Sequence, residues 1–243
     1  MSRNRFAVIA AIGTLATILA SAALAQTPER IEDTLGAPPP EGAAVLFEGA
    51  NTDAWCKQGT DDPIEWKLVE EGAMEVFGGS ATTREHFEDC QLHLEFWEPL
   101  MPNATGQARG NSGVYLQGSY EVQVLDSYDL AEIGMGDCGS IYGVSIARVN
   151  ACQPPEEWQT YDITFRAPRF DPDGNLVEQA RVTVYQNGIL IQDNVEIPGP
   201  TTAAMDRDVT QPGPLMLQDH GCPVRYRNVW LVPVTLNAKL AAE

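Results

Sequence analysis

The sequence predicts an all-β fold, an antiparallel sandwich or barrel, and three observations support it. Short segments that alternate apolar and polar residues recur at spacings of roughly 8 to 15 residues, the pattern of half-buried strands. The 21 glycines and 17 prolines are spread along the chain, as expected where many strands are joined by turns. Beyond the signal-like first 25 residues, no stretch of about a dozen residues shows the apolar period of an amphipathic helix.

The predicted strands begin at residue 44 and continue to residue 231. They cover residues 44–47, 66–69, 73–77, 92–96, 120–124, 161–165, 182–185, 189–191 and 224–231. Asn187 and Gly188 separate two of these apolar runs and predict a tight hairpin, because both residues tolerate a positive φ angle. No second linker interrupts the series, so we predict one domain over residues 43–234, with residues 235–243 as a C-terminal tail.

Residues 1–25 predict a signal peptide. Arg3 and Arg5 precede an uncharged apolar run, which ends in a small-x-small pattern at Ala25. An N-terminal membrane anchor is the alternative, but the run is short for a span of about 20 residues. We therefore expect cleavage after Ala25 and a periplasmic or secreted protein without membrane insertion. Residues 26–42 are polar, contain three consecutive prolines, and predict a linker or an arm draped over the domain.

The charge balance excludes some partners. The chain carries 15 Lys and Arg against 34 Asp and Glu, a net charge of −19. Such a surface repels phosphate backbones and anionic lipid headgroups, so we expect no nucleic-acid partner and no polybasic membrane binding. Hydrophobic residues make up 44% of the chain, which is enough for a sizeable core.

Export would place the five cysteines in an oxidising compartment, where disulfides persist. Cys138 and Cys152 flank a glycine-containing loop and are the predicted disulfide pair. Five cysteines leave at least one unpaired, and the pairing of Cys56, Cys90 and Cys222 is open. A zinc site is the rival interpretation, but the chain has no C-x-x-C motif and only three histidines.

Candidate site residues fall in three segments, the first of which runs from residue 110 to residue 127. Glu121 and Gln123 share one face of a strand, about 7 Å apart, and could act as a base or hold sugar hydroxyls. A solvated strand face is the alternative interpretation. Asp126 has the opposite parity, so it joins the same site only if the strand bulges or ends there.

The second and third segments add aromatic and titratable side chains. Tyr142 and Trp158 lie near acids in loops, which suits stacking on a sugar ring, although Trp158 could equally be a core residue. His220 follows Asp219 and precedes a glycine, and histidine is a residue type suited to proton transfer. A surface histidine in a turn is the alternative.

Glu121 and Asp126 do not form the carboxylate pair of an ordinary retaining glycosidase. Such carboxyl groups lie about 5–5.5 Å apart, whereas five residues of strand span about 16 Å. Glu121 needs a partner from another segment, and His220 is the best candidate.

At these same segments the chain closely resembles the 3-keto-disaccharide hydrolase domain family over nearly all of residues 43–233. The matching motifs, in order, are LFEG at 46–49, GNSGVY at 110–115, YEVQVLDS at 120–127, SIYG at 140–143, EWQTYD at 157–162, LQDHG at 217–221 and YRNVW at 226–230. The resemblance implies a concanavalin A-like jelly roll with a carbohydrate site, and cleavage of glycosides already oxidised to a ketone at C3. The chain departs from the family pattern at two positions: Ser119 stands where relatives often have Arg, and Glu156 where Gly is common. These departures affect the expected substrate more than the expected fold.

The chemistry implied by the resemblance begins at the ketone, which acidifies the C2 proton so that a base can start elimination of the C1 leaving group; water then adds back. We expect Glu121 or His220 to act as base or acid, with Asp126 orienting. Arg227 and Gln218 could hold the ketone or hydroxyls. The remaining expected substrate-binding residues are Asn111, Gln123, Tyr142, Trp158 and Asp219. A divalent cation could polarise the ketone instead, with ligands that the sequence does not identify.

Two other functions are compatible with the sequence. A non-catalytic carbohydrate-binding module would use the same sandwich and aromatic residues. An ordinary glycoside hydrolase acting on unoxidised sugar would need two close carboxylates. In each case the partner is a small saccharide, and the oligomeric state is open.

Overall fold

The computed structural model describes residues 27–234, so the predicted signal peptide and the tail at 235–243 lie outside the described residues. Two short 3-10 turns, Glu70–Gly72 and Gly106–Ala108, accompany the strands. No helix in this range is long and apolar enough to cross a membrane. The strands are β1 (Ala44–Phe47), β2 (Trp55–Lys57), β3 (Lys67–Val69), β4 (Ala73–Glu75), β5 (Ala81–Thr83), β6 (Cys90–Trp97), β7 (Asn111–Leu116), β8 (Tyr120–Leu125), β9 (Trp158–Arg166), β10 (Arg169–Phe170), β11 (Leu176–Glu178), β12 (Ala180–Gln186), β13 (Ile189–Ile197), β14 (Met216–Leu217) and β15 (Arg225–Pro233).

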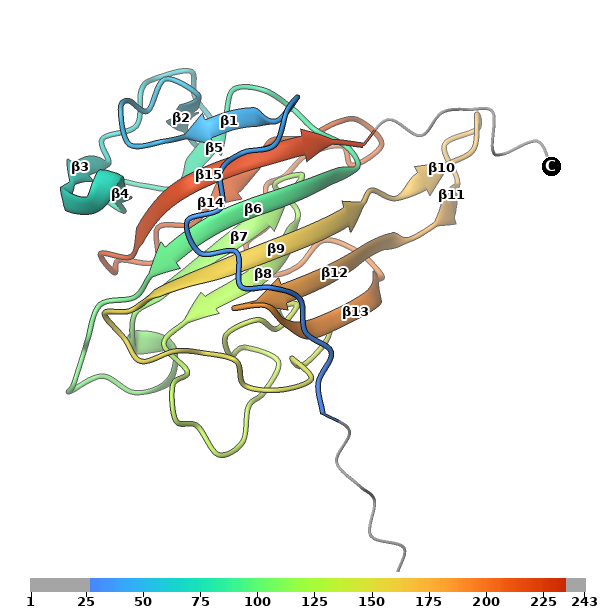
Figure 1. Cartoon of the computed structure of the whole chain (residues 1–243). Coiled ribbons are helices and arrows are strands. Elements are labelled where there is room, and N and C mark those ends of the chain that lie inside the picture. The colour runs from blue at the N-terminus through green and yellow to red at the C-terminus, as the bar shows by residue number, and fades with distance from the viewer. Residues whose placement is uncertain (1–26, 235–243) are drawn as a thin grey trace, which may run out of the picture.

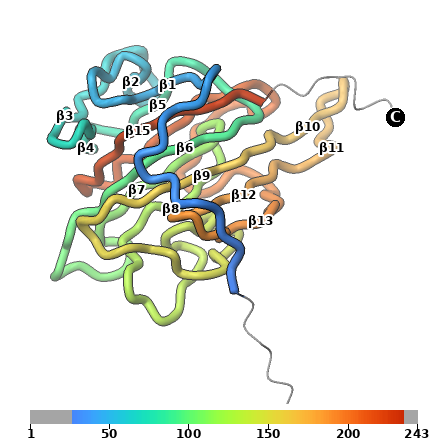
Figure 2. Tube along the Cα trace, in the orientation of Figure 1, coloured from blue at the N-terminus to red at the C-terminus, as the bar shows by residue number. Residues whose placement is uncertain are grey.

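Two antiparallel sheets form a sandwich, which confirms the predicted all-β jelly-roll class (Figure 1). The larger sheet has eight strands in the order β13-β12-β9-β6-β15-β4-β3, with β1 also paired to β15. The smaller sheet has five strands in the order β2-β5-β14-β7-β8. The trace in Figure 2 shows the larger sheet lying over the smaller one. β10 and β11 form a separate two-stranded ribbon.

The core lies between the sheets and follows the two-residue period of the strands. Alternate residues of β6 (Leu92, Leu94, Phe96) and β8 (Val122, Val124) are almost fully buried in it. Each such side chain contributes about 1.5–3 kcal/mol by leaving water. The residues between them therefore point away from the core, and on β8 these are Glu121 and Gln123.

The hairpin predicted at Asn187 and Gly188 is confirmed. Both residues have positive φ, 52° and 73°, and Gln186 pairs with Ile189 across the turn. Gly188 has a second role, because a Cβ placed there would lie 2.8 Å from the carbonyl oxygen of Ile31. The turn can thus accept a close approach of the N-terminal arm.

The arm, residues 27–42, crosses the outer face of the larger sheet (Figure 1). Arg30 bridges to Ile189 of β13, and the Gly36 N–H donates to Glu95 of β6 at 2.7 Å. Asn228 of β15 donates to the Ala37 carbonyl at 2.9 Å. These bonds attach the arm to β13, β6 and β15 in turn, on the side of the sandwich away from the smaller sheet.

Residues 138–142 extend the smaller sheet beyond β8. The Gly139 N–H donates to the Gln123 carbonyl at 3.0 Å, and the Gln123 N–H donates to the Ser140 carbonyl at 3.0 Å. The Tyr142 N–H donates to the Glu121 carbonyl at 3.3 Å. This segment covers the edge of β8 and places Tyr142 beside the polar face of that strand.

Candidate functional site

A pocket of about 150 Å³ lies on the outer face of the smaller sheet, over β7 and β8. Register explains its floor: Gly113 pairs with Gln123 and Tyr115 pairs with Glu121, and directly opposite residues point to the same face. The loops supply the walls. The lining residues are Gln107, Asn111, Tyr115, Glu121, Gln123, Tyr142, Thr202, Ala203, Gln218 and His220.

Glu121 is the only Asp or Glu among the residues that line the pocket. Its side chain is 3% exposed, and burial raises the pKa of this carboxyl from 4.5 to about 7, although a hydrogen bond with Tyr115 acts in the opposite direction. The single proton of the Tyr115 hydroxyl has another acceptor, the Thr202 carbonyl at 3.1 Å. A carboxyl that titrates near neutral pH can take up and release a proton under ordinary conditions.

Gly113 provides the space for this carboxyl group. A Cβ at residue 113 would lie 2.4 Å from Oε1 of Glu121 and 2.9 Å from the ring of Tyr115. Neither distance is compatible with an ordinary carbon contact. Glycine at this strand position therefore allows the Glu121 side chain to lie flat against β7.

Gln123 lines the pocket and carries a buried acceptor without a partner in residues 27–234. It is 1% exposed, and its amide nitrogen has acceptors on Gln107 (3.2 Å), Asn111 (3.4 Å) and Gly136 (3.3 Å). These acceptors fix which end of the amide is nitrogen. The oxygen Oε1 is buried without a hydrogen-bond partner among the described residues. An unpaired buried acceptor is costly and is rare in folded proteins, so this oxygen is a notable feature of the pocket floor.

Tyr142 and His220 lie at the walls of the pocket and bring the other proton donors. Tyr142 is half-buried and follows the segment paired to β8, whereas His220 is exposed. The turn that carries His220 is held by Asp219, whose carboxylate accepts the N–H of Gly221 at 2.7 Å and that of Gly79 at 2.8 Å. Asp219, predicted to bind substrate, thus supports the turn and does not line the pocket.

Asp126 lies outside the pocket, so the expected orienting role at Glu121 has no geometric basis. The Asp126 carboxylate is 1% exposed and pairs with the Arg109 guanidinium at 2.6 Å. In the alternation of the strand Asp126 lies on the same face as Val122 and Val124. The chain turns after Leu125 without bringing Asp126 to the face that carries Glu121.

Trp158 and Arg227 lie on the opposite sheet. Trp158 begins β9 and Arg227 lies in β15, and the Arg227 guanidinium stacks 4.0 Å from the Trp158 ring centre. Arg227 also pairs with Glu95 at 2.7 Å. These side chains stabilise the outer face of the larger sheet near the arm, so their predicted contact with substrate in the Glu121 pocket is not compatible with the structure.

Four residues that line the pocket were not singled out from the sequence. Tyr115 shares strand parity with Asn111 and could have been found from it. Gln107, Thr202 and Ala203 come from loops far from Glu121 in sequence, and no local pattern marks them. The predicted residues that the pocket does bring together are Asn111, Glu121, Gln123, Tyr142, Gln218 and His220.

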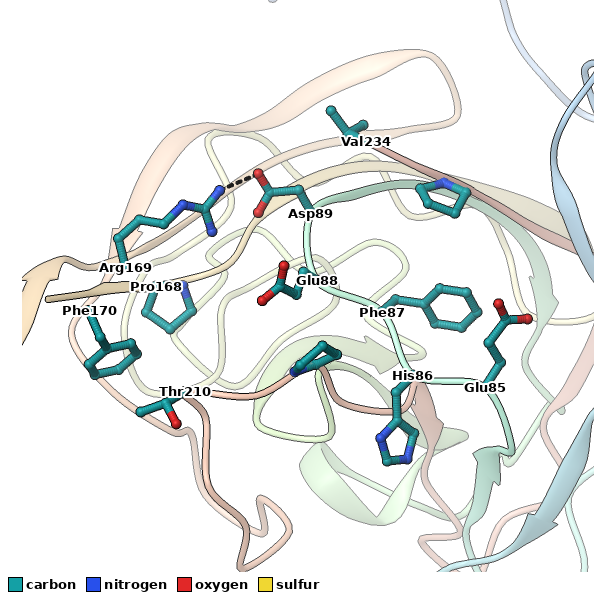
Figure 3. Close-up of a pocket in the computed structure, with 12 residues that line it drawn as sticks. Glu85, His86, Phe87, Glu88, Asp89, Pro168, Arg169, Phe170, Thr210 and Val234 are labelled. Atoms are coloured by element: carbon teal, nitrogen blue, oxygen red, sulfur yellow. Dashed lines mark hydrogen bonds and ion pairs between the residues drawn. The ribbon is translucent and has the colours of Figure 1, made fainter. Parts of the chain in front are cut away.

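A larger cavity of about 620 Å³ lies elsewhere, between the turn before β6 and the ribbon that begins at β10 (Figure 3). None of the predicted site residues lines it. Its buried carboxylate, Asp89, is already paired with Arg169 and with the Ala167 N–H at 2.9 Å. The smaller pocket is the better candidate, because it contains an unpaired acceptor and a carboxyl with a shifted pKa.

Among the described residues, one group of three could hold a metal ion: Glu98, Cys138 and Cys152, whose ligand atoms lie within 4.8 Å of one another. This group lies in the interior and not in the pocket. The pocket itself offers the carboxylate of Glu121 and the imidazole of His220. Cys138 and Cys152, the predicted disulfide pair, are free thiols in this structure.

The comparisons with known proteins agree with the fold and with the geometry of the site. The fold and the site define a jelly-roll protein with one buried carboxyl group in a polar pocket. More narrowly, the chain belongs to the family of 3-keto-alpha-glucoside-1,2-lyase-like domains, whose model matches residues 42–232. This match confirms the family that the sequence motifs indicate.

Solved structures with the same fold include proteins of Parabacteroides distasonis ATCC 8503 described as a "putative glycosyl hydrolase". One is 39% identical, with a TM-score of 0.72, and the match covers 81% of this chain and 86% of that chain. A second is 20% identical, with a TM-score of 0.58, and covers 80% of this chain and 95% of that one. The curated proteins contain no match.

Proposed function

We propose that this protein cleaves the glycosidic bond of 3-keto-glycosides, with Glu121 as the base that removes the C2 proton. The observation that carries the proposal is the buried Glu121 carboxyl, which has a pKa of about 7 and is the single acid in the pocket. A general base works best when its pKa lies near the operating pH. The family supports a 3-keto-glucoside as the substrate class.

In the first step, the C2–H bond breaks and the proton moves to Glu121, while the electron pair forms an enolate with the C3 ketone. The half-buried Tyr142 hydroxyl donates a hydrogen bond to the ketone oxygen and stabilises the charge that develops there. The C1–O bond then breaks, and the leaving oxygen takes a proton from His220 at the pocket opening. Water then adds to C1 and its proton restores His220, while Glu121 returns its proton to C2, so the net reaction is hydrolysis.

The amide side chains bind the sugar substrate before the reaction begins. Gln123 and Asn111 line the pocket, and Gln218 donates to the Tyr115 hydroxyl at 3.1 Å, which fixes the floor of the pocket. Two strands and four loop segments close around a space of about 150 Å³. A pocket of this size suits one sugar ring, with the aglycone outside.

The pocket argues against an ordinary glycoside hydrolase. That chemistry requires a second carboxyl group about 5–10 Å from the first, facing the scissile bond. The pocket has one carboxyl group, and Asp126 is turned away and paired with Arg109. Elimination from a 3-keto sugar needs one carboxylate base and no second carboxyl group, and Glu121 is the one carboxyl group of the pocket.

The test is to incubate the protein with a 3-keto-glucoside and with its unoxidised parent, and to follow release of the aglycone. We expect cleavage of the keto compound alone, and loss of that cleavage in Glu121→Gln. Glu85→Gln, which alters the wall of the larger cavity, is the matched control and should keep full activity. Binding of both sugars without cleavage would instead identify a carbohydrate-binding module.

A parallel incubation with EDTA tests the role given to Tyr142. Unchanged cleavage supports polarisation of the ketone by the protein's own donors. Loss of cleavage, restored by a divalent cation, would assign that step to a metal. The export that we propose from residues 1–25 is tested by N-terminal sequencing of the mature protein, which should begin at Gln26.

A further inference from the structure

A cluster of thiols and polar side chains lies directly behind the pocket, between the two sheets. Cys138 is buried and Cys152 is half-buried, and both sulfur atoms and a Glu98 oxygen lie within 4.8 Å of one another. The Cys138 sulfur is 3.2 Å from the Tyr161 hydroxyl. Burial raises the pKa of the Glu98 carboxyl.

The cluster is connected to the catalytic strand through short hydrogen bonds. The Tyr161 hydroxyl donates to the Gln123 carbonyl at 2.6 Å. Cys138 begins the segment that pairs with β8, since the next residue, Gly139, donates to the same carbonyl. Cys138 therefore anchors the segment that carries Tyr142 into the pocket.

Cys152 belongs to a different part of the chain, the loop that leads into β9. Its N–H donates to Asn150 at 3.2 Å, and Asn150 in turn donates to the Ser127 carbonyl at 2.8 Å. The Cys152 sulfur faces the Leu125 carbonyl at the end of β8. A covalent bond from Cys152 to Cys138 would thus join this loop to the wall of the pocket.

We propose that Cys138 and Cys152 are a redox-sensitive brace for the active site: as a disulfide they hold residues 138–142 against β8, and reduction loosens the wall that carries Tyr142. The proposal goes beyond a pairing inferred from spacing, because it assigns the bridge a function in the pocket. It does not depend on which sugar the pocket accepts.

The oxidation is thiol–disulfide exchange with a small disulfide such as oxidised glutathione. Cys152, the more exposed of the two, attacks first, and its proton passes to the departing glutathione sulfur as the mixed disulfide forms. Cys138 then attacks the Cys152 sulfur and expels the second glutathione thiol. The two cysteine protons end on the two glutathione thiols, and the two electrons reduce the glutathione disulfide.

The direct test counts thiols. The purified protein is oxidised with glutathione disulfide, denatured, alkylated and analysed by peptide mass. We expect three of the five cysteines to be alkylated, with the peptides of Cys138 and Cys152 joined and two hydrogens lighter. Cys56→Ser is the matched control and should keep the bridge. Five free thiols, a lasting glutathione adduct on Cys152, or one tightly bound zinc ion per chain would overturn the proposal.

Hydrogen exchange tests the effect on the pocket without any substrate. The amides of Gly139 and Tyr142 donate to β8, so their exchange should be at least tenfold slower in the oxidised protein than in the reduced one. Cys152→Ser should exchange at the fast rate under both conditions. Equal rates in oxidised and reduced wild-type protein would contradict the brace, even if the disulfide forms. Because neither readout uses cleavage, failure here and failure of the proposed reaction are distinguishable.

Discussion

Replacing Glu121 with Gln should remove the activity and, at the same time, stabilise the protein at neutral and alkaline pH. The variant keeps the shape of the side chain but cannot ionise. In the wild-type protein burial raises the pKa of this carboxyl from 4.5 to about 7. The folded state therefore binds a proton more tightly than the unfolded state does.

The sign and size of the effect follow from this difference. Between pH 4.5 and 7 the folded state holds the proton and the unfolded state has lost it, so the free energy of unfolding falls as pH rises. One pKa unit corresponds to about 1.4 kcal/mol, so the ionised carboxylate reduces stability by about 3 kcal/mol above pH 7 relative to pH 4. In Glu121→Gln this contribution is absent.

Urea unfolding of both proteins at a series of pH values measures the difference. Between pH 4 and pH 8 the free energy of unfolding of the variant should rise by about 3 kcal/mol relative to that of the wild type. The other titrating groups are the same in both proteins, so their contributions cancel in the comparison. The acid limb of the wild-type kcat/KM profile should have its midpoint near 7, because the base acts when deprotonated. Parallel stability curves for the two proteins would refute the buried, shifted carboxyl and with it the assignment of the base.

Three further variants test the surrounding structure. Gly113→Ala places a Cβ 2.4 Å from the Glu121 carboxylate and should lower kcat about 100-fold by misplacing the base; unchanged kcat would show that the strand adapts. Tyr142→Phe should lower kcat by about 100-fold or more with little change in KM, and an effect on KM alone would limit Tyr142 to binding. Gly188→Ala meets the Ile31 carbonyl at positive φ, so it should cost about 1–2 kcal/mol and expose the arm to trypsin, and equal proteolysis would contradict this.

Much of the fold could be predicted from the sequence, because the alternation of apolar and polar residues along a long strand shows which of its faces is buried. Residues 92–96, 120–124 and 161–165 each lie within an observed strand. The six-residue β7 was not predicted, and neither were the strands β2, β5 and β14, of two or three residues each. Such short strands exist because neighbours pair with them, which an alternation pattern cannot reveal.

The candidate site was only partly accessible from the sequence, for a related reason. Strand parity places Glu121 and Gln123 on one face and Asp126 on the other, and the structure has them so. Parity does not say which sheet a residue joins. Trp158 and Arg227 are of residue types that suit sugar binding, but they belong to the larger sheet and face away from the pocket.

The sequence by itself determined the class of fold, the family, and the polar strand face that carries Glu121, because these depend on local alternation and contiguous motifs. Tertiary structure decided which loops close over that face, and therefore which donors meet the carboxylate. It also decided the pKa of Glu121, since burial comes from Tyr115 and from loops distant in the chain. Desolvation is a property of the assembled pocket, so no pattern along one strand could have predicted it.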